Sequence, residues 1–443
     1  MPRPVQTRNL DINIGYTLTC DTCEGDIDCR IGMSNRAVQP LQLVCPHCRT
    51  LIHITLNRRE GPGGGITYKN ASQREDRAYG GPFDGRNPFF NLHLDFPVTN
   101  GKYVPGQTPF FVAMNALRHP SVGENAIQLM VTFAQKVGRL DDFQHSIDDL
   151  DRAIRLYFTP NKQLFKKRAG ELIRRDLGPS MEPASIDDAL YSLLHIAFSP
   201  MIDVQADETW TEQAFTKLNE LSSQKREAFD QFLAALETTQ FLKNLQLDCL
   251  RLYAQMYRAE ISLRPAIFLD LIASTDSPLA SGRVSAKDFG SYKDLYREMC
   301  EIYARQLILA AGLNNLDSRD DHNSFPPHKH GNPLSSLDNF ADKALAEKLK
   351  YLKGGWIPLN LGAVDPSLRN AIAHTTTEYD ETTQMITFFA EKEGMKRERG
   401  RMISYLDFMR ELLILFREMH ALHQLIYLVG HRIHVWRANG SSE

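Results

Sequence analysis

Four cysteines in the first fifty residues have the spacing of a metal site. Cys20 and Cys23 form one C-x-x-C pair, and Cys45 and Cys48 form a second pair 21 residues further along the chain. Each pair can place two thiolates at the tip of a tight turn, and four thiolates complete the closed tetrahedral shell of structural zinc. Short strands around such turns bury little core, so the metal would supply folding energy. The sequence therefore predicts a small zinc-binding module.

The remaining cysteines bear on the ligand set and on the compartment. Cys29 and His47 are alternative ligands, whereas Cys249 and Cys300 lie in segments of helical pattern and are interpreted as small core residues. The total of seven cysteines is odd, and their early clustering favours a metal site in a reducing compartment over a disulfide framework. The N-terminus has no secretory pattern, and no run of 18 apolar residues occurs. We therefore expect a cytoplasmic protein without a membrane partner.

A second group of chemically capable residues is Arg369, Asn370 and His374. Asp365-Pro366 is typical of a helix start, with aspartate at the cap and proline at the first helical position. Asn370 and His374 are four residues apart, so they should lie on one helix face. The backbone amides near a helix start favour an anion such as phosphate.

The residue types of this group fit phosphate chemistry. Arg369 offers a planar fork for phosphate oxygens, His374 can move protons near neutral pH, and Asn370 can hold either side chain. Because no Asp/Glu cluster with metal-ligand spacing lies beside them, we expect no catalytic metal. Attack of an RNA 2′-hydroxyl on its own phosphate is one such reaction. It needs two proton transfers, so two copies of the chain would have to combine their single His374 residues.

A structural interpretation of the same residues stays open. Arg369 could pair with Asp365 on a solvated helix face, and His374 could be an ordinary helix histidine.

The segment from Leu368 to His374, with the hairpin pattern and long amphipathic helix that follow, resembles the HEPN superfamily of helical bundles with an R-x4-6-H motif. The resemblance covers residues 240–436, and its specific part is 368–416. It implies that Arg369 and His374 are catalytic, that Asn370 supports them and that a homodimer cleaves RNA. It also implies a toxin or phage-defence role, controlled by a regulatory protein or a phage-derived trigger.

The resulting fold prediction is mainly α: a helical bundle with a C-terminal HEPN-like domain that contains a β-hairpin insertion, plus a small N-terminal β zinc ribbon. The predicted divisions are a zinc-ribbon-like domain at 1–56, a Gly-rich loop or linker at 57–109, a helical domain at 110–239, the HEPN-like domain at 240–436 and a tail at 437–443.

Two features of the helical segments refine this prediction. Arg264-Pro265 should kink or break the apolar stretch 240–273, because proline lacks the amide that continues a helix. The last helix, from about Ser404 to His434, is apolar over much of its circumference and should be central to a bundle or an interface. His420 and His423 are expected at the flanks of that helix.

A basic run lies after the hairpin. Lys396, Arg397, Arg399 and Arg401 could contact an RNA backbone, although such a run is also typical of a solvated turn. The formal net charge of −3 means that any RNA contact must come from local patches. Two functions therefore stand side by side: a metal-independent endoribonuclease, and a non-catalytic zinc-ribbon/HEPN module that binds or senses RNA, a nucleotide or a protein.

Overall fold

The computed structural model describes residues 13–58, 65–74, 83–119, 125–178, 180–272, 282–286, 289–326, 334–389 and 400–440. These residues are mostly helical, with a small N-terminal β region that carries the four cysteines, as the sequence predicts. The chain divides into two compact units, each built from three stretches. The first unit comprises Met1–His145, Arg258–Lys293 and His374–Leu413, and the second comprises Ser146–Tyr257, Asp294–Ala373 and Ile414–Glu443.

The first unit contains a five-stranded sheet with the order β6-β1-β2-β7-β8, in which only the β2–β7 pair is parallel. Its strands are β1 (Asn13–Cys20), β2 (Asp26–Gly32), β6 (Ala71–Gln73), β7 (Phe89–Leu92) and β8 (Asn100–Gly101). A second sheet, with the order β3-β4-β5, consists of β3 (Val38–Val44), β4 (Leu51–Asn57) and β5 (Gly65–Lys69). The strands β5 to β8 fall within 57–109, so the described part of that range completes both sheets instead of serving as a linker.

The two sheets share one apolar core. Strand β4 alternates between buried and half-buried side chains along its whole length, which is the pattern of a strand with one covered face. Its Ile52 and Ile54 join Leu18 and Ile31 of the larger sheet in a single cluster of buried side chains. The hairpins that carry the cysteines are thus fixed to each other through their strands.

Three helices complete the core of the first unit: α1 (Pro109–Leu117), α2 (Ala126–Gln144) and α9 (Glu260–Leu269). The Phe96, Phe133 and Phe268 rings meet with centroids 5.1 to 5.5 Å apart, and they join the segment after β7 to α2 and α9. The helix is interrupted by a turn at Ala259, between α8 (Phe241–Arg258) and α9, whereas Pro265 lies inside α9. The break predicted at Arg264-Pro265 therefore occurs one and a half turns earlier.

A third sheet of the first unit follows His374 in the chain. It is antiparallel, with the order β11-β10-β9, and its strands are β9 (Thr377–Asp380), β10 (Met385–Phe388) and β11 (Arg401–Ser404). The amide of Tyr405 donates to the carbonyl of Gln384, which ties the start of the next helix to this sheet.

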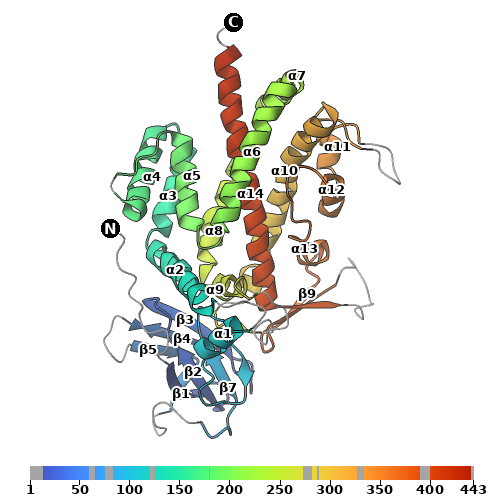
Figure 1. Cartoon of the computed structure of the whole chain (residues 1–443). Coiled ribbons are helices and arrows are strands. Elements are labelled where there is room, and N and C mark those ends of the chain that lie inside the picture. The colour runs from blue at the N-terminus through green and yellow to red at the C-terminus, as the bar shows by residue number, and fades with distance from the viewer. Residues whose placement is uncertain are drawn as a thin grey trace. The chain divides into compact units, whose positions relative to one another are not determined.

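The second unit is helical where it is described. Its helices are α3 (Ile147–Tyr157), α4 (Lys162–Leu177), α5 (Ile186–Phe198), α6 (Val204–Gln224), α7 (Arg226–Thr238), α8 (Phe241–Arg258), α10 (Lys293–Arg319), α11 (Leu337–Ala341), α12 (Leu345–Leu352), α13 (Pro366–Ala373) and most of α14 (Tyr405–Gly440). The helices α3, α4 and α5 lie side by side in Figure 1, and adjacent members of this group are in contact. Asn161, Ser185 and Asp203 cap their helices by accepting hydrogen bonds from amides of the first turn.

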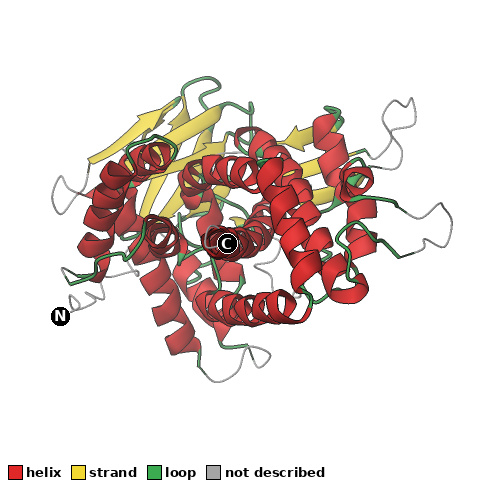
Figure 2. Cartoon of the chain, turned by 90° about the horizontal axis from the view of Figure 1, so that it is seen from above, coloured by secondary structure: helices red, strands yellow, loops and turns green. Residues whose placement is uncertain are grey.

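The helix α14 is seen end-on at the centre of Figure 2. It is long and apolar enough to cross a membrane, with a mean hydropathy of 1.3 over its most apolar window, yet 72% of that window is buried inside the protein. This combination is typical of the central helix of a helical core.

Candidate functional site

The four predicted cysteine ligands come together in the first unit. Their sulfur atoms all lie within 4.8 Å of one another, and the Cys20–Cys48 and Cys23–Cys45 pairs are both 3.7 Å apart. Four thiolates about 2.3 Å from a zinc ion would form a tetrahedron with edges of about 3.8 Å. Two of the sulfur–sulfur distances therefore match the edge of a tetrahedral thiolate site, and no pair exceeds that edge by more than about 1 Å.

The backbone builds both halves of this site in the same way. The Cys20 amide donates to the Gly25 carbonyl, and the Cys45 amide donates to the Thr50 carbonyl at the same sequence separation. In each turn, the amide of the residue after the second cysteine donates back to the carbonyl of the first, at 2.9 Å. Those two residues, Glu24 and Arg49, have φ angles of +59° and +64°. The β1–β2 and β3–β4 hairpins thus end in two equivalent turns, each carrying two of the four cysteines.

The surroundings of the four sulfurs differ. Burial raises the pKa of the Cys45 thiol to about 12, whereas the hydroxyl and the amide of Thr50 lower the pKa of Cys48 to about 6. A bound cation would favour the thiolate form of all four residues, because only the thiolate is a metal ligand.

The two alternative ligands are not part of the sulfur group. Cys29 lies in the middle of β2 with its side chain fully buried in the core, where burial raises its thiol pKa. The His47 ring lies against the backbone of Gly25, where a Cβ atom would come within 2.5 Å of the ring, and its Nε2 is 3.3 Å from the Asp26 carbonyl. Gly25 thus lets one turn approach the other closely.

The helix that carries Arg369, α13, starts where the sequence predicts, but it ends before His374, which was expected on its face. Asp365 caps α13 by accepting hydrogen bonds from the amides of Ser367 and Leu368, at 2.8 and 3.3 Å. Helix α13 ends at Ala373, so His374 follows the helix instead of lying on its face. His374 is exposed, and it is also the first residue of the last stretch of the first unit.

Among the described residues of the second unit, the side chain of Arg369 has two polar partners. Its Nη1 donates to the Asn370 side-chain oxygen at 3.0 Å, and its Nη2 forms an ion pair with Glu301 of α10. The Arg369 side chain is 28% exposed and that of Glu301 is 51% exposed. The guanidinium is therefore held at the surface by an amide and by a carboxylate that comes from another helix.

The predicted basic run is described only at its end. Lys396, Arg397 and Arg399 lie outside the described residues. Arg401 is exposed in β11, and its guanidinium lies over the ring of Phe388, 5.2 Å from the centroid.

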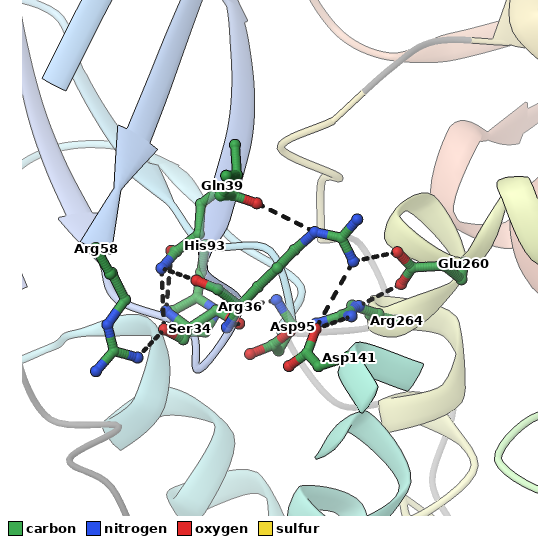
Figure 3. A network of polar contacts seen from close by, with 10 residues as sticks. Ser34, Arg36, Gln39, Arg58, His93, Asp95, Asp141, Glu260 and Arg264 are labelled. Carbon is green, nitrogen blue, oxygen red and sulfur yellow. Dashed lines mark hydrogen bonds and ion pairs between the residues drawn. The ribbon is translucent and has the colours of Figure 1, made fainter. Parts of the chain in front are cut away.

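Sequence reasoning missed a buried ion cluster in the first unit (Figure 3). The guanidinium of Arg264 is fully buried and contacts Asp95, Asp141 and Glu260, at 2.9, 2.6 and 2.7 Å. Arg36, from the loop between β2 and β3, forms a second ion pair with Glu260. Burial lowers the pKa of Arg264, but the three carboxylates outweigh burial and raise it well above its usual value. This cluster ties α9 and α2 to the β region.

A second missed group lies in the core of the helical unit. Tyr253 Oη lies 2.8 Å from His420 Nδ1 and 2.9 Å from His423 Nδ1, and Tyr191 Oη lies 3.2 Å from His423 Nε2. His420 Nε2 lies 3.5 Å from an Asp207 oxygen. One phenol proton can serve one imidazole while the oxygen accepts from the other. His420 Nε2 also lies 3.2 Å from the side-chain nitrogen of Gln424, so the direction of donation along this group is set by the tautomers of the two imidazoles.

Acidification should destabilise the helical unit through His423. Burial lowers the pKa of His423 to about 3, against about 6.5 in an unfolded chain. Between these two pKa values the unfolded chain binds a proton at His423 and the folded chain does not. The free energy of unfolding therefore decreases as the pH is lowered, and at pH 5 it is about 2 kcal/mol smaller than well above pH 6.5. Urea unfolding at pH 5 to 7 should give a shallower pH dependence for His423→Gln, whereas His434→Gln, at an exposed position of the same helix, should keep the wild-type slope. Equal slopes for all three proteins would contradict this explanation.

Comparison with known proteins gives no relative: no family model, no curated protein and no solved structure matches the chain.

Proposed function

We propose that the protein is a metal-independent endoribonuclease that works as a homodimer. The observation that carries the proposal is the arrangement at α13: Arg369 and Asn370 are hydrogen-bonded to each other at an accessible surface, and an exposed histidine follows the helix directly. A guanidinium held by hydrogen bonds and an exposed imidazole five residues further along the chain can supply charge neutralisation and proton transfer, the two requirements for transphosphorylation of RNA.

The roles follow from the contacts. A guanidinium has five N–H donors, and the contacts with Asn370 and Glu301 leave donors of Arg369 for phosphate oxygens. The Asn370 contact limits the directions in which the fork can point, which lowers the entropy lost when phosphate binds. His374 would remove the proton of the 2′-hydroxyl or protonate the leaving 5′-oxygen. The partner copy would supply the second imidazole.

We further propose that the four cysteines hold zinc and that its role is structural. Four protein ligands close the tetrahedral shell and leave no position for water or substrate, in contrast to a catalytic zinc site. The supposed ribonuclease residues belong to other parts of the chain, so cleavage should not require this ion to take part in the reaction.

The ribonuclease proposal can be tested with Arg369→Ala and His374→Ala, compared with wild type on total RNA in magnesium-free buffer with EDTA. Each variant should lose at least about a hundredfold in cleavage rate, because proton transfer and charge neutralisation each contribute that much or more. Arg155→Ala, at an exposed arginine of α3, is the matched control and should cleave like wild type.

Three outcomes would count against the proposal. Equal cleavage by wild type and both variants would contradict the assignment of Arg369 and His374 as catalytic residues. Products without a 2′,3′-cyclic phosphate would contradict attack by the 2′-hydroxyl. If light scattering shows a monomer both with and without RNA, the two copies cannot share one active site. RNA binding without cleavage by wild type would instead identify a non-catalytic RNA-binding module. The zinc content should be measured before and after EDTA, so that loss of fold is not mistaken for loss of catalysis.

A further inference from the structure

We propose that the helical unit binds a flat organic cation, with an amidinium-like or guanidinium-like charge, in a pocket between α6, α14 and the segment after α12. The pocket has a volume of about 240 Å³. Its lining includes the Asp207 and Glu418 carboxylates, the Trp210 indole, the His420 imidazole and the apolar side chain of Ile357. This ligand site is separate from the proposed ribonuclease residues.

Asp207 is the first reason to expect a cation. Its side chain is only 10% exposed, and among the described residues its one polar side-chain contact is the 3.5 Å approach to His420. A carboxylate that has lost most of its water normally gains two or three short hydrogen bonds or an ion pair. A cationic ligand with N–H groups would supply those missing partners.

Glu418 is the second reason. Burial raises the pKa of its carboxyl group, and among the described residues its hydrogen bond is the one accepted from the amide of Asn360, at 3.0 Å. Asp203 also lines the pocket and is partly engaged in capping α6. The positive group on this lining is Arg417, whose Nε donates to the carbonyl of Met201. The wall therefore carries three carboxylates and one guanidinium, an excess of negative charge.

The Trp210 ring favours a flat ligand. The indole nitrogen donates to the Ala421 carbonyl at 3.1 Å, so the orientation of the ring is fixed. The Trp356 ring packs near it, with the ring centroids 5.9 Å apart. A cation gains energy over an indole face, and the gain increases when water is excluded.

The His420 imidazole does not satisfy Asp207. Its Nε2 lies 3.2 Å from the Gln424 side-chain nitrogen, closer than the 3.5 Å that separates it from the Asp207 oxygen. The Asp207 carboxylate can therefore still accept hydrogen bonds from the N–H groups of a ligand.

Benzamidinium is a suitable probe, and benzamide is its neutral isostere. Isothermal titration with wild type should show saturable binding of benzamidinium with a dissociation constant in about the millimolar range or tighter. Benzamide should bind at least about tenfold more weakly, because it lacks the charge. Asp207→Asn and Glu418→Gln should each weaken benzamidinium binding by about tenfold or more.

The matched control is Glu237→Gln, which changes a carboxylate in a different pocket of the same unit and should keep wild-type affinity. Circular dichroism would confirm that each variant is folded. If Asp207→Asn does not fold, the affinity of Glu418→Gln for benzamidinium is the test of the proposal. No saturable binding, equal binding of benzamide, or full affinity in both pocket variants would overturn the proposal. Because no RNA is involved, its failure is distinct from failure of the ribonuclease proposal.

Discussion

Cys45→Ser is expected to abolish binding of one zinc ion per chain and to unfold the β region of the first unit. Structural zinc contributes about 10–16 kcal/mol in small modules, which is as large as the total stability of a typical domain. The Cys45 sulfur is fully buried and 3.7 Å from that of Cys23, so a serine hydroxyl would leave the ion three thiolates and a poor fourth ligand. Metal analysis should give one zinc for wild type and none for the variant, and amide exchange should show lost protection in strands β1 to β4.

Cys29→Ala is the control that separates a ligand from a core cysteine. Cys29 is equally buried and lies in the hairpin of Cys20, but its sulfur is outside the cluster. The variant should keep its zinc and lose only the smaller energy of a shortened core side chain, about 1 kcal/mol or somewhat more. Retention of zinc by Cys45→Ser together with its loss by Cys29→Ala would show that the ligand set is different.

Arg264→Met should cost about 3–5 kcal/mol of unfolding free energy, because it leaves Asp95, Asp141 and Glu260 buried with Arg36 as the remaining cation of the cluster. Chemical unfolding at pH 7 would measure the loss. Arg155→Met serves as the surface control: Arg155 pairs with Asp151 on an exposed face of α3, and loss of such a pair costs about 0–1 kcal/mol.

The pH dependence of Arg264→Met provides an independent check. Burial already raises the pKa of Asp141 in the wild-type protein, and removal of the nearest guanidinium should raise it further. The folded variant would then bind protons more readily than its unfolded chain does, so lowering the pH toward 5 should narrow the gap between variant and wild type. A gap that stays constant from pH 7 to pH 5 would mean that lost packing, and not unpaired charge, explains the loss.

The cysteine site could be predicted because its information is local. Each C-x-x-C pair forms one turn with its own backbone hydrogen bonds, and the pairing of β3 with β4 brings the second turn into place. Pattern reasoning also found the start of α13, because an Asp-Pro pair has a local capping role.

The Arg264 cluster could not be found in this way. Asp95, Asp141 and Arg264 are far apart in sequence, and Arg264 next to a proline is interpreted from pattern alone as a helix break. His420 and His423 present the same difficulty: a histidine on an apolar helix can be buried only if partners such as Tyr253 and Tyr191 come from other helices. The ion pair between Arg369 and Glu301 of α10 could not be predicted from local spacing either, because Glu301 belongs to a distant helix in the sequence.

The interleaving of the two units has a consequence for synthesis on the ribosome. Asp95 and Asp141 are made early, whereas Arg264 belongs to the second stretch of the same unit. At about 5–20 residues per second, Asp95 and Asp141 are made about ten seconds before Arg264, and of the two arginines of the cluster only Arg36 is present in that interval. During that interval the early stretch can close its cysteine turns but cannot bury its acids. A nascent chain halted between Asp141 and Arg264 would expose the core of the first unit, which is still incomplete. The growing polypeptide should therefore bind chaperones until translation passes residue 413, the last residue of that unit.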